Sequence, residues 1–160
     1  MDTELYKNWN KLIDEAWVWS EKCNTATEFF NVVSKNVSPL HSSASLIARV
    51  LVEHQKGGFK GLIQVGLGPS MYRMYMTLIS LKKILMFDHY IDTLISMFKK
   101  ADELYYEYLD CYEDASHSDP ISLIRMASVM KQYQVLDREF VKYHERFLNS
   151  YSRYINRLID

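Results

Sequence analysis

Hydrophobic residues recur along most of the chain every three or four positions, which is the period of an amphipathic α-helix. In the first such segment, expected over about 3–21, the apolar positions are Leu5, Trp9, Leu12, Ala16 and Trp19. A longer segment, expected from near Asp88 until residues 116–120 end it, follows the same period through Ile91, Leu94, Ile95, Phe98, Ala101, Tyr105, Tyr108 and Tyr112. The pattern therefore predicts helices rather than strands.

Capping residues and glycines divide the first half of the chain. Thr25 and Glu28 have the spacing of a capping box, which predicts the start of a second helix. Pro39 is expected to stop that helix, and a third helix is expected from about Ser42 to the pair Gly57-Gly58. The apolar segment 59–67 is expected to form a helical turn and a loop packed on the core.

Prolines mark the helices of the second half. Pro69 is expected to open a helix that reaches about Phe87, since proline is tolerated in the first turn. Asp119 followed by Pro120 predicts a capped helix over about 121–131. A last helix is expected over about 136–158.

Composition supports this all-α interpretation. The chain has 160 residues, a length that suits one domain, and it contains only 5 glycines and 3 prolines. These are too few turn residues for a barrel or sandwich of many short strands. We therefore predict a single compact α-helical domain, residues 1–160, of six to seven helices.

Charge, cysteine content and hydropathy limit the possible partners and cellular location. The formal net charge is −1, which removes the simple case for direct binding to nucleic acid. Two cysteines cannot form a disulfide framework, so a reducing cytoplasm is expected. The most apolar run, 71–87, contains Arg73, Lys82 and Lys83, so no membrane span is predicted.

The glycine pair belongs to a longer motif. Residues 53–68 read EHQKGGFKGLIQVGLG, and residues 136–140 read LDREF. From about Leu46 to the C-terminus the chain resembles a bacterial all-α family of unknown function that includes a small DNA-mimic protein, in which a GGF motif ends a helix. The resemblance implies the same fold, and it raises the hypothesis that an acidic surface sequesters a transcription factor. In physical terms Gly57, Gly58 and Phe59 are interpreted as a structural motif, because glycine turns the chain after a helix and Phe59 can pack back on the helix end.

Acidic residues are concentrated in one block. Residues 101–120 contain seven acidic side chains and no Lys or Arg. Within the block Glu103, Glu107, Asp110 and Asp114 are spaced four, three and four residues apart, which places them on one helix face. At a rise of 1.5 Å per residue, neighbouring carboxylates lie about 4.5 to 6 Å apart along the axis, similar to the phosphate repeat of a nucleic-acid strand. These four residues are the predicted partner-binding site, with a solvated helix face as the alternative interpretation.

Catalytic signals are weaker. The chain has neither a Glu-x-x-His nor a His-Glu-x-x-His sequence, so neither a di-iron nor a zinc site is indicated, and no cofactor or metal is predicted. Glu107, Asp110 and Glu113 resemble the Mg²⁺ ligands of all-α nucleotide pyrophosphohydrolases, but such a site needs a second acidic helix facing the first. The candidates for it are Asp14 with Glu15 and Asp88 with Asp92.

Tryptophan and methionine suggest self-association. The first helix is apolar on more than one side, and methionines surround the start of the fourth. Core packing explains such residues in most proteins, while a protein interface would also use them. A homodimer with Trp9, Trp17 or Met71 at its interface is the corresponding hypothesis.

The residues favour a non-enzymatic, cytoplasmic bacterial protein that binds another protein, as a DNA-mimic-like regulator of a transcription factor. A toxin-neutralising immunity protein and a small metal-dependent all-α hydrolase are the alternatives. Acidic residues that converge with a second acidic helix on a pocket would favour the hydrolase. Acidic residues on an open convex face would favour protein binding.

Overall fold

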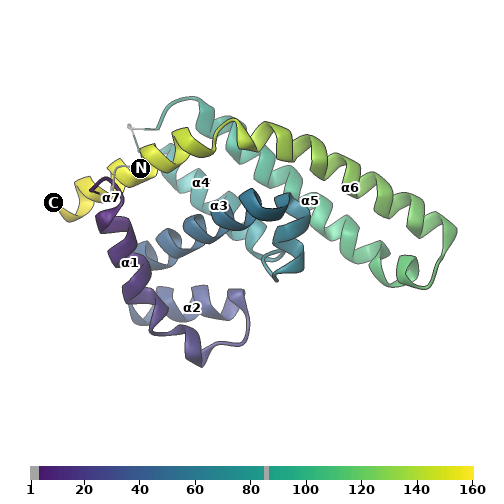
Figure 1. Cartoon of the computed structure of the whole chain (residues 1–160), viewed down its shortest axis with the longest axis horizontal. Helices are drawn as coiled ribbons and strands as arrows, with labels where there is room; N and C mark the ends of the chain where they lie inside the picture. Colours follow the sequence, from purple (N-terminus) through teal and green to yellow (C-terminus); the bar gives the residue numbers. More distant parts are fainter. Residues whose placement is uncertain (1–3, 85–86) are drawn as a thin grey trace.

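The chain forms seven α-helices in the computed structural model, which describes residues 4–84 and 87–160 (Figure 1). The helices are α1 Lys7–Trp17, α2 Ala26–Asn36, α3 Pro39–Gln64, α4 Ser70–Lys82, α5 Tyr90–Ser116, α6 Pro120–Val141 and α7 His144–Ile159, and a 3₁₀ turn, η1 Ser20–Lys22, follows α1. Within the described residues there is no strand. The predicted all-α fold is confirmed.

Local capping begins several helices where the sequence predicts. The Thr25 hydroxyl accepts a hydrogen bond from the backbone N–H of Glu28 at 3.1 Å. The Glu28 carboxylate in turn accepts one at 3.0 Å from the N–H of Asn24, the residue before the N-cap. The predicted Thr25 cap is therefore present, with the return bond one residue earlier than in a standard capping box. Asp119 caps α6 by accepting from the N–H of Ser122 at 2.9 Å. Each cap satisfies a backbone donor that the helix cannot pair internally.

All seven helices contribute to one packed unit. α3 contacts α1, α2, α4 and α6, while α5 lies along both α4 and α6, and α7 packs on α1. Aromatic rings fill the region where α3, α5 and α6 meet, and the rings of Phe59, Phe98, Tyr133 and Phe140 are all almost fully buried there. A single continuous core of this kind is what defines a single domain.

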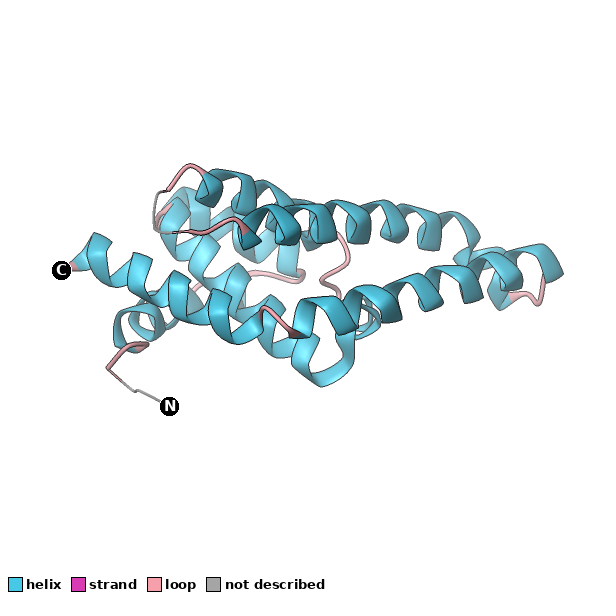
Figure 2. Cartoon of the chain, turned by 90° about the horizontal axis from the view of Figure 1, so that it is seen from above, coloured by secondary structure: helices cyan, strands magenta, loops and turns pink. Residues whose placement is uncertain are grey.

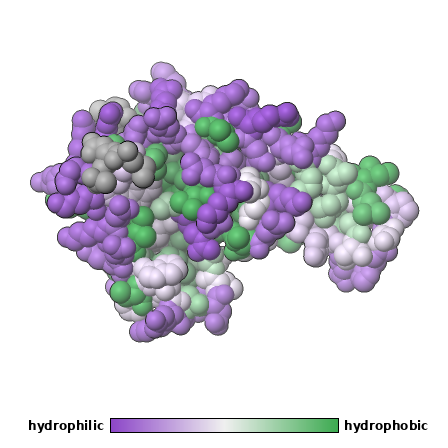
Figure 3. All heavy atoms as spheres, viewed as in Figure 1, coloured by the Kyte–Doolittle hydropathy of each residue, from purple (hydrophilic) through white to green (hydrophobic). Residues whose placement is uncertain are grey.

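The far ends of α5 and α6 extend beyond this core. We refer to residues 105–116 of α5 and 120–131 of α6 as the arm. Figures 1 and 2 show from two directions that the arm projects past the other helices, opposite α1 and α7. In Figure 3 it is a narrow lobe, with hydrophobic residues gathered toward its end. The arm thus exposes helix faces that a compact bundle would cover.

The boundary between the last two helices differs from the prediction. α6 does not stop near Lys131 but continues to Val141, and α7 begins at His144 rather than near Leu136. The interruption expected at 132–135 is absent because Tyr133 faces the core at 1% exposure and donates a hydrogen bond to the carbonyl of Ala101 at 2.8 Å. Because this ring is buried, α6 remains helical through residues 132–135 and keeps the same side toward the core.

Smaller differences occur at other helix ends. Pro39 opens α3 as its first residue, with Ser38 as the N-cap, instead of only ending α2. α1 ends at Trp17 and α4 ends at Lys82, both earlier than expected. Segment 59–64 is helical, and only 65–69 forms a loop. The expected helix start at Thr3 and residues 85–86 of the expected fourth helix lie outside the described residues.

None of the described helices is both long enough and apolar enough to cross a membrane.

Candidate functional site

The acidic residues predicted to bind a partner lie along one flank of α5, three of them on the arm. Glu103, Asp110 and Asp114 are exposed, and Glu107 is half-buried. Asp102 lies beside them, and burial, followed by the negative charge of Glu103, raises the pKa of its carboxyl. We refer to Glu103, Glu107, Asp110 and Asp114 as the acidic flank.

One member of the acidic flank is paired within the protein. Both Nη2 and Nε of Arg125, on α6, lie against Oε1 of Glu107, at 2.7 and 2.8 Å. This hydrogen bond is the main cause of a raised Arg125 pKa, to which the charge of Asp110 also contributes. The flank therefore presents three carboxylates without an ion-pair partner among the described residues, beside one neutralised by Arg125.

Arg125 belongs to the candidate site through its pairing with Glu107, and the spacing of residues along α5 does not indicate it. Arg125 lies about one and a half turns after Pro120, the first residue of α6. Since α6 follows α5 directly in the chain, the two helices are expected to be neighbours. Pairing with Glu107 links the two helices of the arm.

The second predicted motif, Gly57-Gly58-Phe59, lies where α6 crosses α3, with Gly57 exposed, Gly58 half-buried and Phe59 in the core. Dihedral angles inside α3 are helical except at Gly58, whose φ of 65° and ψ of −163° are accessible in practice to glycine alone. The N–H of Phe59 consequently has no partner one turn earlier. It donates instead to Oδ1 of Asp137 on α6 at 2.8 Å. A side chain from a distant helix therefore caps the second segment of α3.

The same carboxylate also holds a buried histidine. Nε2 of His54 lies 2.9 Å from Oδ1 of Asp137, which indicates the tautomer that carries the proton on Nε2. The His54 ring is packed edge-on against the rings of Phe59, Phe140 and His144, at centroid separations of 4.6–4.9 Å. We refer to His54, Gly58, Phe59 and Asp137 as the α3–α6 junction. It joins the GGF motif directly to the 136–140 segment.

The two histidine rings at the junction are closed to substrates. His54 is 3% exposed, and its Nδ1 has no hydrogen-bond partner and no contact with solvent. His144 is 8% exposed, and burial, reinforced by the neighbouring His54, lowers its pKa to about 4. An Asp–His pair without an accessible ring nitrogen cannot act as a general base, so the arrangement is structural.

Three of the four other candidate ligands are engaged in ion pairs, and the fourth, Asp14, is exposed on α1 with no ion-pair partner among the described residues. Glu15 pairs with Lys11 at 3.9 Å and lies 2.6 Å from Nε2 of His41. Asp88 pairs with Arg146 at 3.0 Å, and Asp92 pairs with Lys82 at 2.7 Å. Over residues 4–84 and 87–160 no group of three or more His, Cys, Asp or Glu side chains is placed to hold a metal ion. Glu107, Asp110 and Glu113 are thus not joined there by the second acidic helix that the hydrolase hypothesis requires.

The residues expected at a homodimer interface fall in different environments. Trp9 is 3% exposed and Met71 is 1% exposed, so their assignment to an interface is wrong. Trp9 donates from its indole N–H to the carbonyl of Ala44 at 2.9 Å, which satisfies its polar atom inside the core. Trp17, at 59% exposure, is the one residue of the three that a partner chain can reach.

Comparisons of the chain with protein-family models, curated proteins and solved structures found no match.

The conformation of Gly58 can be tested by comparing alanine substitutions at Gly58 and Gly57. In Gly58→Ala the new Cβ would lie 2.5 Å from Oδ2 of Asp137, on a backbone that disfavours any side chain. We expect a loss of about 2 kcal/mol or more in the free energy of unfolding, measured by chemical denaturation. Gly57→Ala is the control, since nothing lies within 4 Å of its added Cβ, and it should gain about 0.5–1 kcal/mol. Equal effects of the two substitutions would contradict the assigned geometry.

Burial of neutral His144 predicts a pH dependence. Its pKa is lower in the folded chain, about 4, than the ordinary value of 6.5, so between these values the unfolded chain binds more protons. Stability should therefore fall as the pH is lowered through this window, by about 2 kcal/mol between pH 7 and pH 5 from this residue. His144→Gln should remove that part of the loss, whereas His117→Gln, at an exposed position, should retain it. Identical pH profiles for both variants, in urea denaturation, would show that His144 titrates normally.

Proposed function

We propose that the protein is a non-enzymatic binding module whose acidic flank engages a basic surface of another protein. The observation that carries the proposal is the position of Glu103, Asp110 and Asp114. They are exposed, and the helix that carries them, α5, runs into the projecting arm (Figures 1 and 2). Carboxylates in this position can meet the Lys and Arg side chains of a partner without rearrangement of the fold.

The environment of these carboxylates supports binding over catalysis. They are exposed, and among the described residues they belong to no group of three or more His, Cys, Asp or Glu side chains that could hold a metal ion. The metal-dependent hydrolase therefore has no supporting observation in the described part of the chain.

Apolar residues on the arm support a protein partner. Tyr106 is 61% exposed on α5, while Ile121 and Ile124 are 71% and 72% exposed in the first turns of α6. Protein interfaces combine such apolar and aromatic side chains with a charged rim. A free acidic helix would need no exposed isoleucines, so these residues favour a contact surface at the arm.

The family resemblance supports a DNA-binding transcription factor as the partner, in a bacterial cytoplasm. A protein that grips DNA phosphates offers the basic groups that a row of carboxylates can occupy. A toxin neutralised by this chain remains the alternative, and a partner identified by mass spectrometry distinguishes the two. The homodimer is a separate proposal that rests on exposed Trp17.

The test removes charge without removing size. The flank variant Glu103→Gln/Asp110→Asn/Asp114→Asn leaves the Glu107–Arg125 pair intact. Tagged parent and variant proteins are used to capture partners from the native lysate at low and high salt. We expect a protein retained by the parent at low salt to be lost from the flank variant, and to be lost from the parent as salt screens exposed charges beyond about 8 to 10 Å.

A matched control separates this surface from total charge. Asp14→Asn/Glu21→Gln/Glu145→Gln removes the same number of charges from exposed positions on the body. The control variant should retain the partner as the parent does, and both variants should unfold within about 0.5 kcal/mol of the parent because solvated carboxylates contribute little to stability. If parent, flank variant and control retain the same proteins at every salt concentration, the acidic flank is only a solvated helix face.

A further inference from the structure

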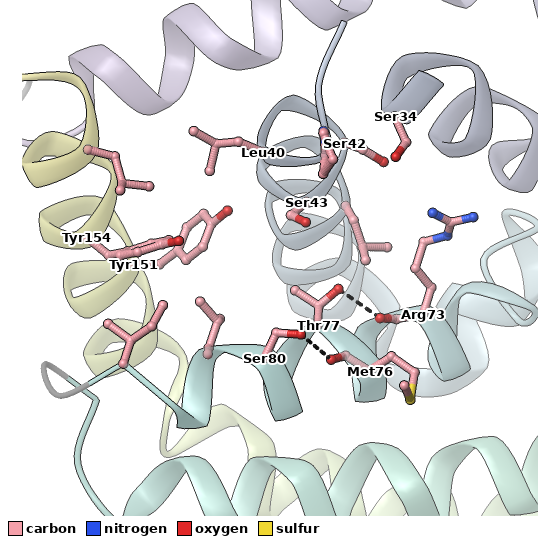
Figure 4. A pocket seen from close by; sticks show the side chains of 15 residues that line it. Ser34, Leu40, Ser42, Ser43, Arg73, Met76, Thr77, Ser80, Tyr151 and Tyr154 are labelled. Atoms are coloured by element: carbon pink, nitrogen blue, oxygen red, sulfur yellow. Dashed lines mark hydrogen bonds between the residues drawn. The ribbon is translucent and has the colours of Figure 1, made fainter. Parts of the chain in front are cut away.

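A pocket of about 550 Å³ opens between α3, α4 and α7, on the body rather than on the arm (Figure 4). Its volume lies within the range of small-molecule sites. Leucines and other apolar side chains form much of its wall, including Leu40, Leu46 and Leu81. The pocket can thus accept the aliphatic part of a ligand.

The pocket lining carries positive charge only, from Arg73. Arg73 is the cation among the described lining residues, and none of these residues is Asp or Glu. Its guanidinium donates to Oδ1 of Asn31, and across the described chain no carboxylate forms an ion pair with it. Burial lowers the Arg73 pKa, yet arginine remains charged in proteins. The rim of the pocket therefore carries a positive charge that is not neutralised within the protein.

Tyr151 supplies a second, independent feature. Its side chain is 1% exposed, and its hydroxyl has no hydrogen-bond partner among the described residues. Figure 4 shows the tyrosine hydroxyls of α7 directed into the pocket, on the side away from Arg73. Burial raises the pKa of Tyr151, so the hydroxyl stays protonated and can donate. A buried donor without an acceptor costs free energy that a ligand oxygen would recover.

Two other hydroxyls that line the pocket are already used in hydrogen bonds within α4. Thr77 and Ser80 donate to the carbonyls of Arg73 and Met76, at 2.8 and 3.3 Å, as the dashed lines in Figure 4 show. Ser43 has no such bond among the described residues and lies between the Arg73 and Tyr151 sides of the pocket. The donors at the two ends of the pocket are therefore Arg73 and Tyr151.

We propose that this pocket binds an amphipathic organic anion: an aliphatic carboxylate whose head group pairs with Arg73 and whose far end carries an oxygen that accepts a hydrogen bond from Tyr151. The aliphatic part lies against Leu40, Leu46 and Leu81. This site is separate from the acidic flank, so failure of either proposal leaves the other standing.

Calorimetric titration tests the proposal with the alkanoates from hexanoate to dodecanoate, their ω-hydroxy derivatives and alkylammonium ions of the same lengths, all below their micelle concentrations. We expect saturable binding of the anions that depends on chain length, and no comparable binding of the cations. Arg73→Gln should weaken both anion series at least about tenfold, since hydrogen bonds to charged groups are the stronger ones. Arg138→Gln, which removes an exposed cation elsewhere, should bind as the parent does.

Tyr151→Phe provides the sharper control. It should weaken the ω-hydroxy series about three- to tenfold and leave the plain alkanoates unchanged. Because the hydroxyl has no partner in the protein, this variant should unfold at the same temperature as the parent or higher. Absence of saturable anion binding, equal affinity for cations, or equal affinity in the parent and Arg73→Gln would overturn the site. Equal weakening of both series by Tyr151→Phe would overturn the assignment of the ligand's far end.

Discussion

The Asp137 carboxylate is the contact on which the architecture depends. Its Oδ1 accepts the Phe59 N–H at 2.8 Å and lies 2.9 Å from Nε2 of His54, so one oxygen joins α6 to both segments of α3. Without it the bend at Gly58 would leave a buried backbone donor unpaired, at a cost of about 1–3 kcal/mol. The bend buries Phe59 among the rings of α5 and α6, and the direction in which α6 leaves this junction sets the position of the arm.

Helix starts that depend on a capping residue next to the helix could be predicted from the sequence. Thr25 with Glu28 and Asp119 with Pro120 act through bonds to the next turn, so short-range spacing identifies them. The boundary between α6 and α7 could not be predicted in this way. Residues 142–143 contain neither glycine nor proline, and the helix continues to that point because Tyr133 and Phe140 are buried against α3 and α5. Tertiary packing decides this boundary.

The same distinction applies to the sites. Spacing of three and four residues placed the acidic flank on one face, but the Glu107–Arg125 pair joins two helices and has no signature in either alone. The pairing of Asp137 with His54 spans 83 positions and was beyond any local pattern. The pocket at Arg73 and Tyr151 is likewise assembled from helices distant in sequence. The three features lie in different parts of the molecule: the α3–α6 junction at the core, the acidic flank along α5 and the pocket on the body.

Native-state hydrogen exchange of the Phe59 amide, followed as denaturant is added, tests the junction most directly. If Asp137 holds the bend as described, this amide exchanges only when the whole domain unfolds. Its opening free energy then equals that of buried helical amides such as Ile47, and falls with denaturant at the same slope. Exchange through small local fluctuations, at a rate independent of denaturant and far faster than that of Ile47, would contradict the account.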